Sequence, residues 1–118
     1  MDISQAESLV VSALEDIKGK DIQVIDTTRL TALFERVVIA SGDSNRQTRS
    51  LARNVADKAR EAGLEVLSVE GEDSGEWVLV DLGSIVVHVM QPAVRAYYNL
   101  EELWAGQRNP RHALARSA

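Results

Sequence analysis

The stretch VVIASGDSNRQTRSLARNVADKAR, residues 37–60, decides the fold because its residue pattern changes period within a few positions. Residues 37–40 form a continuous apolar run, which is typical of a strand buried on both faces. From Asn45 to Ala62 the apolar residues recur at helical spacing, and Gly63 follows them as a typical helix end. The stretch therefore predicts a buried strand, a short turn and a long helix, which together are a unit of α/β folds.

The turn in this stretch, SGDSNRQ (residues 41–47), raises the question of catalysis, since α/β enzymes often hold phosphates between a strand and a helix. A phosphate-binding loop would add further glycines and a lysine followed by serine or threonine. Metal-assisted phosphoryl transfer would need paired carboxylates, but Asp43 stands alone and the chain holds no D-x-D motif. Ser44 and Gln47 have the spacing of a capping box. The residues therefore favour a structural corner over a catalytic loop.

The rest of the chain supplies further helices and strands around this unit. The predicted elements are a helix over 4–18, strands over 21–26 and 34–41, a helix over 45–62, a strand over 64–71, two strands within 77–90 and a helix over 99–106. The order αββαβββα predicts an α/β fold with a single mixed sheet and packed helices.

Local motifs mark the ends of several of these elements. Ser4 with Glu7 and Asn99 with Glu102 have the spacing of capping boxes at the first and last helices. Gly83, in the segment Leu82-Gly83-Ser84, supplies the positive φ that a tight hairpin between the last two strands needs. We therefore expect both terminal helices to be capped by their own side chains.

Length and composition predict one domain without covalent or metal crosslinks. The 118 residues suit a single core, which we expect to span residues 1–105, followed by a loose basic tail over 106–118. The absence of cysteine excludes disulfides and thiol catalysis. No apolar run reaches the roughly 20 residues that span a bilayer. The acidic N-terminus lacks a signal-peptide pattern, so we expect no membrane partner and a cytoplasmic location.

Charge is distributed unevenly along the chain, whose net charge is −5. Three arginines and no acid among residues 106–118 contribute +3, so residues 1–105 carry −8. A folded region this acidic is poorly suited to wrapping bare nucleic acid and better suited to a basic protein partner. The alternative interpretation is that the acidity serves solubility alone.

Histidines provide no evidence for a metal centre or for acid–base catalysis. His88 lies within the apolar strand pattern IVVHVM, where a single histidine is usually a core or edge residue. Metal sites need several convergent ligands, and nothing near His88 resembles a nucleophile elbow. The sequence therefore predicts no catalytic residue, no metal and no cofactor.

Aromatic residues gather in the last third of the chain together with acids. Trp77, Trp104, Tyr97 and Tyr98 fall within 28 residues, and aromatic side chains are enriched at interface hot spots. The surrounding acids are Glu70, Glu72, Asp73, Glu76, Asp81, Glu101 and Glu102. This combination is typical of a surface that binds a basic protein, although both tryptophans could instead be core residues.

Two details bear on that choice between surface and core. Asp81 alternates with Trp77 and Leu79, so a carboxylate interrupts an apolar row on one strand face. At the rim of an interface it could pair with an incoming lysine or arginine, whereas buried it would need a partner. Tyr97, Leu100 and Trp104 are expected to lie on one stripe, and Trp104, on the amphipathic last helix, suits the core.

The ordered segments of the chain resemble the ribosomal silencing factor family, also called the Iojap-like proteins. The resemblance covers roughly residues 3–105. Its segments are DIQVIDTTRLTALFERVVIASGDSNRQTRSLA, EGEDSGEWVLVDLGSIVVHVM and PAVRAYYNLEELW. The resemblance implies a sheet like that of nucleotidyltransferases without their catalytic carboxylates, and a protein that is not an enzyme.

The same resemblance implies a function that composition does not reach. Such proteins bind the large ribosomal subunit at a basic ribosomal protein, block joining with the small subunit and lower translation under nutrient limitation. They also tend to self-associate, so a homodimer is expected in the free state. A degenerate nucleotidyltransferase-like enzyme and an adaptor for another basic protein are the alternatives.

The resemblance, together with the acidic turn, implies a set of partner-binding residues in this sequence. Its members are Glu70, Trp77, Asp81, Gly83, Arg95, Tyr97, Tyr98 and Leu100. Ser84 stands where the family usually has an acid, which removes one negative charge from the proposed edge. A minor contact with ribosomal RNA is the hypothesis for four arginines of the long helix, whose simpler interpretation is a solvated face. They are Arg46, Arg49, Arg53 and Arg60.

Overall fold

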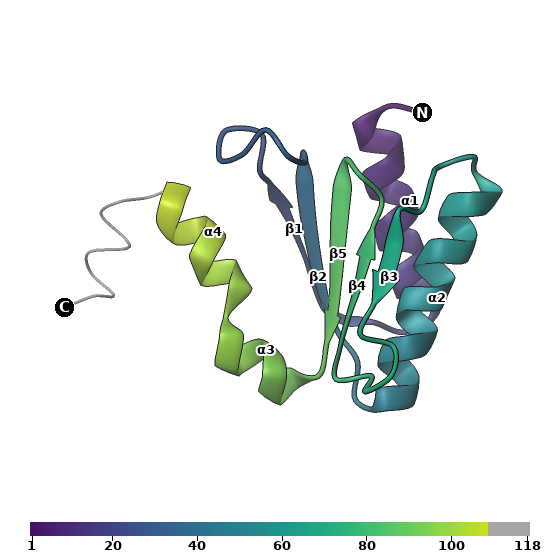
Figure 1. The fold of residues 1–118 in the computed structure, drawn as a ribbon. Helices are drawn as coiled ribbons and strands as arrows, with labels where there is room; N and C mark the ends of the chain where they lie inside the picture. The colour runs from purple at the N-terminus through teal and green to yellow at the C-terminus, as the bar shows by residue number, and fades with distance from the viewer. Residues whose placement is uncertain (109–118) are drawn as a thin grey trace.

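A computed structural model describes residues 1–108 of the chain. Its elements are α1 (Ile3–Asp16), β1 (Lys20–Asp26), β2 (Arg36–Ser41), α2 (Asn45–Glu61), β3 (Ser68–Glu70), β4 (Trp77–Asp81), β5 (Ile85–Met90), α3 (Pro92–Tyr98) and α4 (Leu100–Arg108). The strands form one sheet in the order β1-β2-β5-β4-β3. β2 and β5 run parallel, and the other neighbours pair antiparallel. The predicted α/β fold with a single mixed sheet is confirmed (Figure 1).

Helices lie on both sides of this sheet, with α1 and α2 on one side and α3 and α4 on the other (Figure 1). The larger apolar cluster fills the space under α1 and α2, with Val10, Leu14, Leu51 and Val55 from the helices. A smaller cluster on the opposite face contains Ile25, Val37, Ile39 and Met90. The two faces of the sheet therefore have separate hydrophobic cores.

The run at residues 37–40 lies in β2, where both faces of the strand are covered. Val38 and Ala40 belong to the larger cluster, whereas Val37 and Ile39 belong to the smaller one. All four side chains are at most 1% exposed. A strand between two covered faces has no polar side, so the prediction of burial on both faces is confirmed.

The C-terminal helical region differs from the prediction, because it holds two helices rather than one. Pro92 ends β5, as predicted, but it also occupies the first turn of α3, where its missing N–H costs nothing. Asn99 then adopts a left-handed conformation with φ 49° and separates α3 from α4. The described order is therefore αββαβββαα. α4 extends to Arg108, and residues 109–118 of the predicted tail lie outside the described residues.

The predicted strand over 64–71 is shortened to Ser68–Glu70. The N–H of Leu64 donates to the carbonyl of Ala59 at 2.8 Å, so this residue completes the end of α2. Gly63, with φ 84°, makes that ending, as predicted. Leu64 and Val66 pack against the larger cluster, so their alternation reflects burial without a ladder of hydrogen bonds.

Both predicted capping boxes at the terminal helices need correction. α1 begins at Ile3, and its cap is Asp2, whose carboxylate accepts from the N–H of Gln5 at 2.8 Å. The side-chain oxygen of Gln5 accepts from the N–H of Asp2 at 3.1 Å, so the box is shifted two residues towards the N-terminus from Ser4. At the other end, the Asn99 amide donates to the carboxylate of Glu102, while its backbone caps the C-terminus of α3.

Candidate functional site

The corner at residues 41–47 uses its polar groups to hold the fold together. Ser44 accepts from the N–H of Gln47 at 3.0 Å, as predicted. The Gln47 side chain does not return to Ser44. It accepts from the N–H of Asp43 at 2.7 Å and donates to the carbonyl of Ile17 at 3.2 Å. The corner is thus tied to the end of α1, and this supports the structural interpretation.

Three further observations bear on the phosphate-loop alternative. A Cβ on Gly42 would lie 2.9 Å from the methyl of Thr48, so this glycine permits close packing of β2 against α2. The Asp43 carboxylate pairs with Lys20 at 2.5 Å. Across residues 1–108, no group of three or more His, Asp or Glu side chains is arranged to hold a metal ion.

The side of the sheet opposite α1 and α2 carries a surface with three of the predicted partner-binding residues, Glu70, Trp77 and Asp81. We call this surface the β3–β5 face; its members are Glu70, Trp77, Leu79, Asp81, Val86 and His88. Strand register places them together, because Glu70 pairs with Leu79, Leu79 with His88, and Asp81 with Val86. Directly paired residues project on the same side of a sheet. The predicted row of Trp77, Leu79 and Asp81 is half-buried, whereas the intervening Val78 and Val80 are fully buried on the α1–α2 side.

Trp77 belongs to both the core and the surface. Its ring packs against the smaller cluster, and its indole Nε1 donates to Nδ1 of His88 at 3.0 Å. Burial lowers the pKa of His88 from 6.5 to about 4, so the ring is neutral at pH 7. A neutral imidazole can leave Nδ1 unprotonated as the acceptor. His88 therefore orients Trp77 through this hydrogen bond.

An aromatic pocket adjoins Trp77 where β4 meets α3. It has a volume of about 350 Å³ and is lined by Ser74, Glu76, Trp77, Ala93, Val94, Tyr97 and Tyr98. The ring centroids of Trp77 and Tyr98 are 4.9 Å apart, and those of Tyr97 and Tyr98 are 5.0 Å apart. Tyr97 is 82% exposed and Tyr98 is 54% exposed, so their rings are open to a partner.

A second, more apolar groove lies further along the same face. Its volume is about 390 Å³, and it is lined by Leu33, Phe34, Leu67, Glu70, Leu79, Asp81, Gly83 and Val86. The Asp81 carboxylate accepts from the N–H of Gly83 at 2.8 Å, so it also fixes the hairpin turn. Three predicted residues, Glu70, Asp81 and Gly83, are thereby brought together beside an apolar floor.

Two predicted residues lie beneath the surface instead of on it. Arg95 is 8% exposed; its guanidinium donates to Glu101 at 3.0 Å and to the hydroxyl of Ser41 at 2.9 Å. Leu100 packs against the smaller cluster. Both residues hold α4 to the sheet, and neither lines the aromatic pocket or the groove.

The predicted common stripe of Tyr97, Leu100 and Trp104 is wrong. Tyr97 lies on α3 and is mostly exposed, whereas Leu100 and Trp104 lie on α4 and pack against the smaller cluster. The Trp104 ring meets the Phe34 ring edge-on, with centroids 5.7 Å apart. Trp104 is therefore a core residue, as its position on the helix indicated. The break at Asn99 separates the residues that the stripe had joined.

A comparison with known families identifies the group to which this architecture belongs. The sequence model described as "Ribosomal silencing factor during starvation" matches residues 1–117. The chain belongs to the ribosomal silencing factor family. The resemblance found in the ordered segments of the sequence is thereby confirmed.

Individual relatives of this ribosomal silencing factor family agree. A ribosomal silencing factor of Chromobacterium violaceum is 56% identical over 108 residues, which cover 92% of this chain and 88% of that protein. A crystal structure of a protein from the same organism superposes with a TM-score of 0.88 at 56% identity, covering 89% of this chain and 88% of that one. A mouse protein named "Mitochondrial assembly of ribosomal large subunit protein 1" is 31% identical over 99 residues, 81% of this chain and 43% of that protein.

In this silencing-factor fold, three of the four arginines considered for RNA contact are engaged within the molecule. Arg49 donates to the carbonyls of Glu72 and Asp73 at 2.6 and 2.8 Å. Arg53 pairs with the Glu72 carboxylate at 3.1 Å, and Arg60 pairs with Asp57 at 3.7 Å. Arg49 and Arg53 thus hold the acidic loop over residues 71–76 against α2, beside the aromatic pocket. The fourth, Arg46, is exposed.

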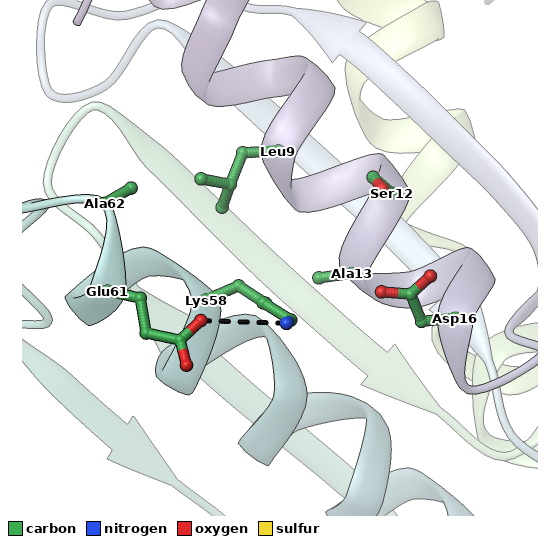
Figure 2. Close-up of a pocket in the computed structure, with 7 residues that line it drawn as sticks. All are labelled: Leu9, Ser12, Ala13, Asp16, Lys58, Glu61 and Ala62. Carbon is green, nitrogen blue, oxygen red and sulfur yellow. Dashed lines mark ion pairs between the residues drawn. The ribbon is translucent and has the colours of Figure 1, made fainter.

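One further groove lies on the other side of the sheet, between α1 and α2. It has a volume of about 370 Å³ and is lined by Leu9, Ser12, Ala13, Asp16, Lys58, Glu61 and Ala62. Figure 2 shows Lys58 and Glu61 at its edge, where their charged groups pair at 3.6 Å. None of the predicted partner-binding residues lines this groove. Among residues 1–108, no helix has both the length and the apolar character needed to cross a membrane.

Proposed function

We propose that this ribosomal silencing factor binds the large ribosomal subunit at a basic ribosomal protein and sterically blocks joining with the small subunit. The expected consequence is lower translation under nutrient limitation, in the cytoplasm. Family membership supports a silencing role at the ribosome. The name of the mouse relative refers to the large ribosomal subunit and favours that subunit as the partner.

The observation that carries the proposal is the character of the β3–β5 face. It joins an aromatic pocket to an apolar groove through the row of Trp77, Leu79 and Asp81. Carboxylates of Glu70, Glu76 and Asp81 lie along it. Apolar area provides binding energy, and an acidic surface attracts a basic partner and rejects an acidic one.

A charge reversal on this face tests the proposed surface. Glu70 is exposed and lines the groove, so Glu70→Lys is compatible with the fold and places a cation opposite a basic partner. We expect less protein to co-sediment with isolated large subunits, by about tenfold in affinity, since like charges across an interface cost energy. The same variant should allow small subunits to join in a gradient assay that the wild-type protein blocks.

The matched control is Glu61→Lys, an identical change in charge on the α1–α2 side. Any added lysine also favours nonspecific attraction to ribosomal RNA, so a specific loss must appear against this background. Equal co-sedimentation of the two variants would contradict the proposed surface. Failure of the wild-type protein to co-sediment with large subunits at low salt would contradict the proposed function.

Self-association in the free state is a further part of the proposal. The β3–β5 face is open when no ribosome occupies it, and exposed leucines border its groove: Leu33 is 82% and Leu67 55% exposed. A second copy could cover this apolar area. Light scattering on the purified protein should then give the mass of a homodimer, and a monomeric mass at micromolar concentration would contradict self-association.

A further inference from the structure

We propose that the aromatic pocket is a binding site for one arginine side chain of the protein partner. The inference rests on the proposed function for the identity of the partner and extends it to the chemistry of one contact. Its lining combines three aromatic rings with a single carboxylate, that of Glu76. The arginine side chain combines a planar cation, which stacks on aromatic rings, with a fork of N–H donors, which binds a carboxylate.

The exposed rings provide the first observation. Tyr97 is 82% exposed and Tyr98 is 54% exposed, so Tyr97 buries little area that could stabilise the fold and Tyr98 keeps about half of its surface open. Tyr97 meets Tyr98 at an interplanar angle of 80°, which turns the two rings to different sides of a corner. A cation needs only one open ring face within about 6 Å of the centroid, and this corner offers more than one.

The carboxylate of Glu76 provides the second observation. Glu76 is exposed, and within residues 1–108 its side chain has no ion-pair or hydrogen-bond partner. Its backbone, by contrast, is fixed on both sides. The N–H of Glu76 donates to the Ser74 hydroxyl at 3.2 Å, and its carbonyl accepts from the N–H of Gln91 at 3.0 Å. An unpaired acid thus stands on an ordered backbone at the mouth of an aromatic pocket.

The basic residue of α3, Arg95, does not occupy this site. Its guanidinium is buried and donates to Glu101 and to Ser41. Two cations that contact the loop, Arg49 and Arg53, are bound to Glu72 and Asp73, and no lysine or arginine of residues 1–108 lines the pocket. Among the described side chains, the pocket therefore has acidic charge without an internal cation, which favours a cation from outside.

Binding of a minimal probe tests the site without the ribosome. N-acetylarginine N-methylamide should shift the NMR signals of the Trp77 indole and the two tyrosine rings in a saturable way, while the Trp104 indole stays unchanged. The lysine counterpart should bind more weakly because it is a point charge without a planar fork. The citrulline counterpart, which has a similar shape and no charge, should produce no saturable shift.

Variants assign the effect to the pocket. Tyr97→Ala and Glu76→Gln are each expected to weaken arginine binding about two- to fivefold, as for a cation–π contact or ion pair at an exposed site. Leu103→Ala and Glu65→Gln, matched exposed changes away from the pocket, should leave it unchanged. Equal shifts with arginine and citrulline, no shift at all, or unchanged binding in both pocket variants would overturn the proposal.

The two proposals fail separately. If the wild-type protein co-sediments with large subunits but the arginine probe does not bind, the arginine site is wrong and the proposed function stands. If the probe binds as described but the protein does not co-sediment with large subunits, the site stands and its partner is a different basic protein.

Discussion

At the scale of single residues, Trp77 is neither a purely buried residue nor a purely exposed one, and His88 holds it in this position. The tryptophan side chain packs against the smaller cluster and also lines the aromatic pocket. His88 fixes it through one hydrogen bond of 3.0 Å. Sequence alone placed both residues on strands, but only the pairing of Leu79 with His88 shows that Trp77 and His88 share a face.

Stability should depend on pH through His88. Its pKa is lowered by burial from 6.5 to about 4 in the folded protein, so the unfolded chain binds the proton more readily. The stabilisation is complete above pH 6.5 and is lost as the pH falls towards 4, by about 2–3 kcal/mol in the free energy of unfolding. Urea unfolding at a series of pH values measures this change.

The control for the pH experiment is His88→Asn, which keeps an acceptor for Trp77 and removes the titrating ring. Carboxylates titrate in both proteins, so the difference between the two curves isolates His88. The variant should lose less stability between pH 6.5 and 4 than the wild-type protein. Parallel curves would show that His88 does not titrate with a lowered pKa.

Gly71 is a second residue whose role, close packing of a loop against β4, is not indicated by any sequence pattern. It has φ 88°, and a Cβ there would lie 2.1 Å from the carbonyl oxygen of Trp77. Gly63 has a similar φ of 84°, yet a Cβ there would meet nothing within 4 Å. The pair separates backbone strain, which both positions share, from a steric clash with β4, which only Gly71 has.

Gly71→Ala should therefore destabilise the protein more than Gly63→Ala. We expect a loss of about 1 kcal/mol in the free energy of unfolding for Gly63→Ala, from the left-handed backbone alone. Gly71→Ala should cost about 3 kcal/mol or more, because the loop at 71–76 must move away from Trp77. Chemical denaturation measures both, and equal losses would show that the loop relaxes without cost.

At the scale of elements, predictions were reliable where burial alone sets the pattern. The apolar run in β2 matches its burial on both faces, and the amphipathic pattern in α2 matches the one face that it buries. The segment at 64–67 is different, since Leu64 and Val66 are partly buried without pairing to a strand. Alternation reports which side chains face the core, and it does not report which backbone groups form a ladder.

Strand pairing also decides which of the predicted partner-binding residues lie close together. Glu70, Asp81 and Gly83 come together because strand pairing carries residues two apart to one face. The burial of Arg95 could not be predicted, because a single charged residue in a short helix gives no periodic signal. Leu33 and Leu67 were missed because they lie in segments before β2 and β3, where no sequence pattern marks an apolar groove.

The element that depends most on a single polar contact is α4. The Glu101 carboxylate receives the buried Arg95 guanidinium at 3.0 Å, and its other oxygen, Oε1, is buried with no hydrogen-bond partner. Removing this acid leaves a buried cation with only the Ser41 hydroxyl. α4 should then lose part of its attachment to the sheet.

Glu101→Leu is expected to lower the free energy of unfolding by about 1–3 kcal/mol, and to speed hydrogen exchange in α4 more than in α2. Leu103→Ala, on an exposed position of the same helix, provides the comparison. If exchange in α4 is equally fast in the wild-type protein and in Glu101→Leu, the ion pair does not hold this helix.

At the scale of the whole molecule, the two sides of the sheet have different characters. The α1–α2 side buries the larger core, and its groove is bordered by a lysine–glutamate pair. The β3–β5 face exposes aromatic and aliphatic side chains among acids, and no lysine or arginine of the described region lines its pocket or its groove. This asymmetry is the physical basis for expecting one side to bind a basic partner and the other to remain in solvent.

Salt dependence follows from that asymmetry. If acids on the β3–β5 face attract a basic protein, co-sedimentation with large subunits should fall as salt rises, because ions screen exposed charges within about 10 Å at 0.1 M. Glu70→Lys removes an attractive charge and adds a repulsive one, so its affinity should vary less steeply with salt than that of the wild-type protein. Glu61→Lys, on the far side, should keep a slope at least as steep as that of the wild-type protein, because its added lysine contributes only salt-dependent attraction to ribosomal RNA. Identical slopes for wild-type protein and Glu70→Lys would mean that Glu70 does not face the basic partner, and that the binding energy of this face comes from its apolar and aromatic area.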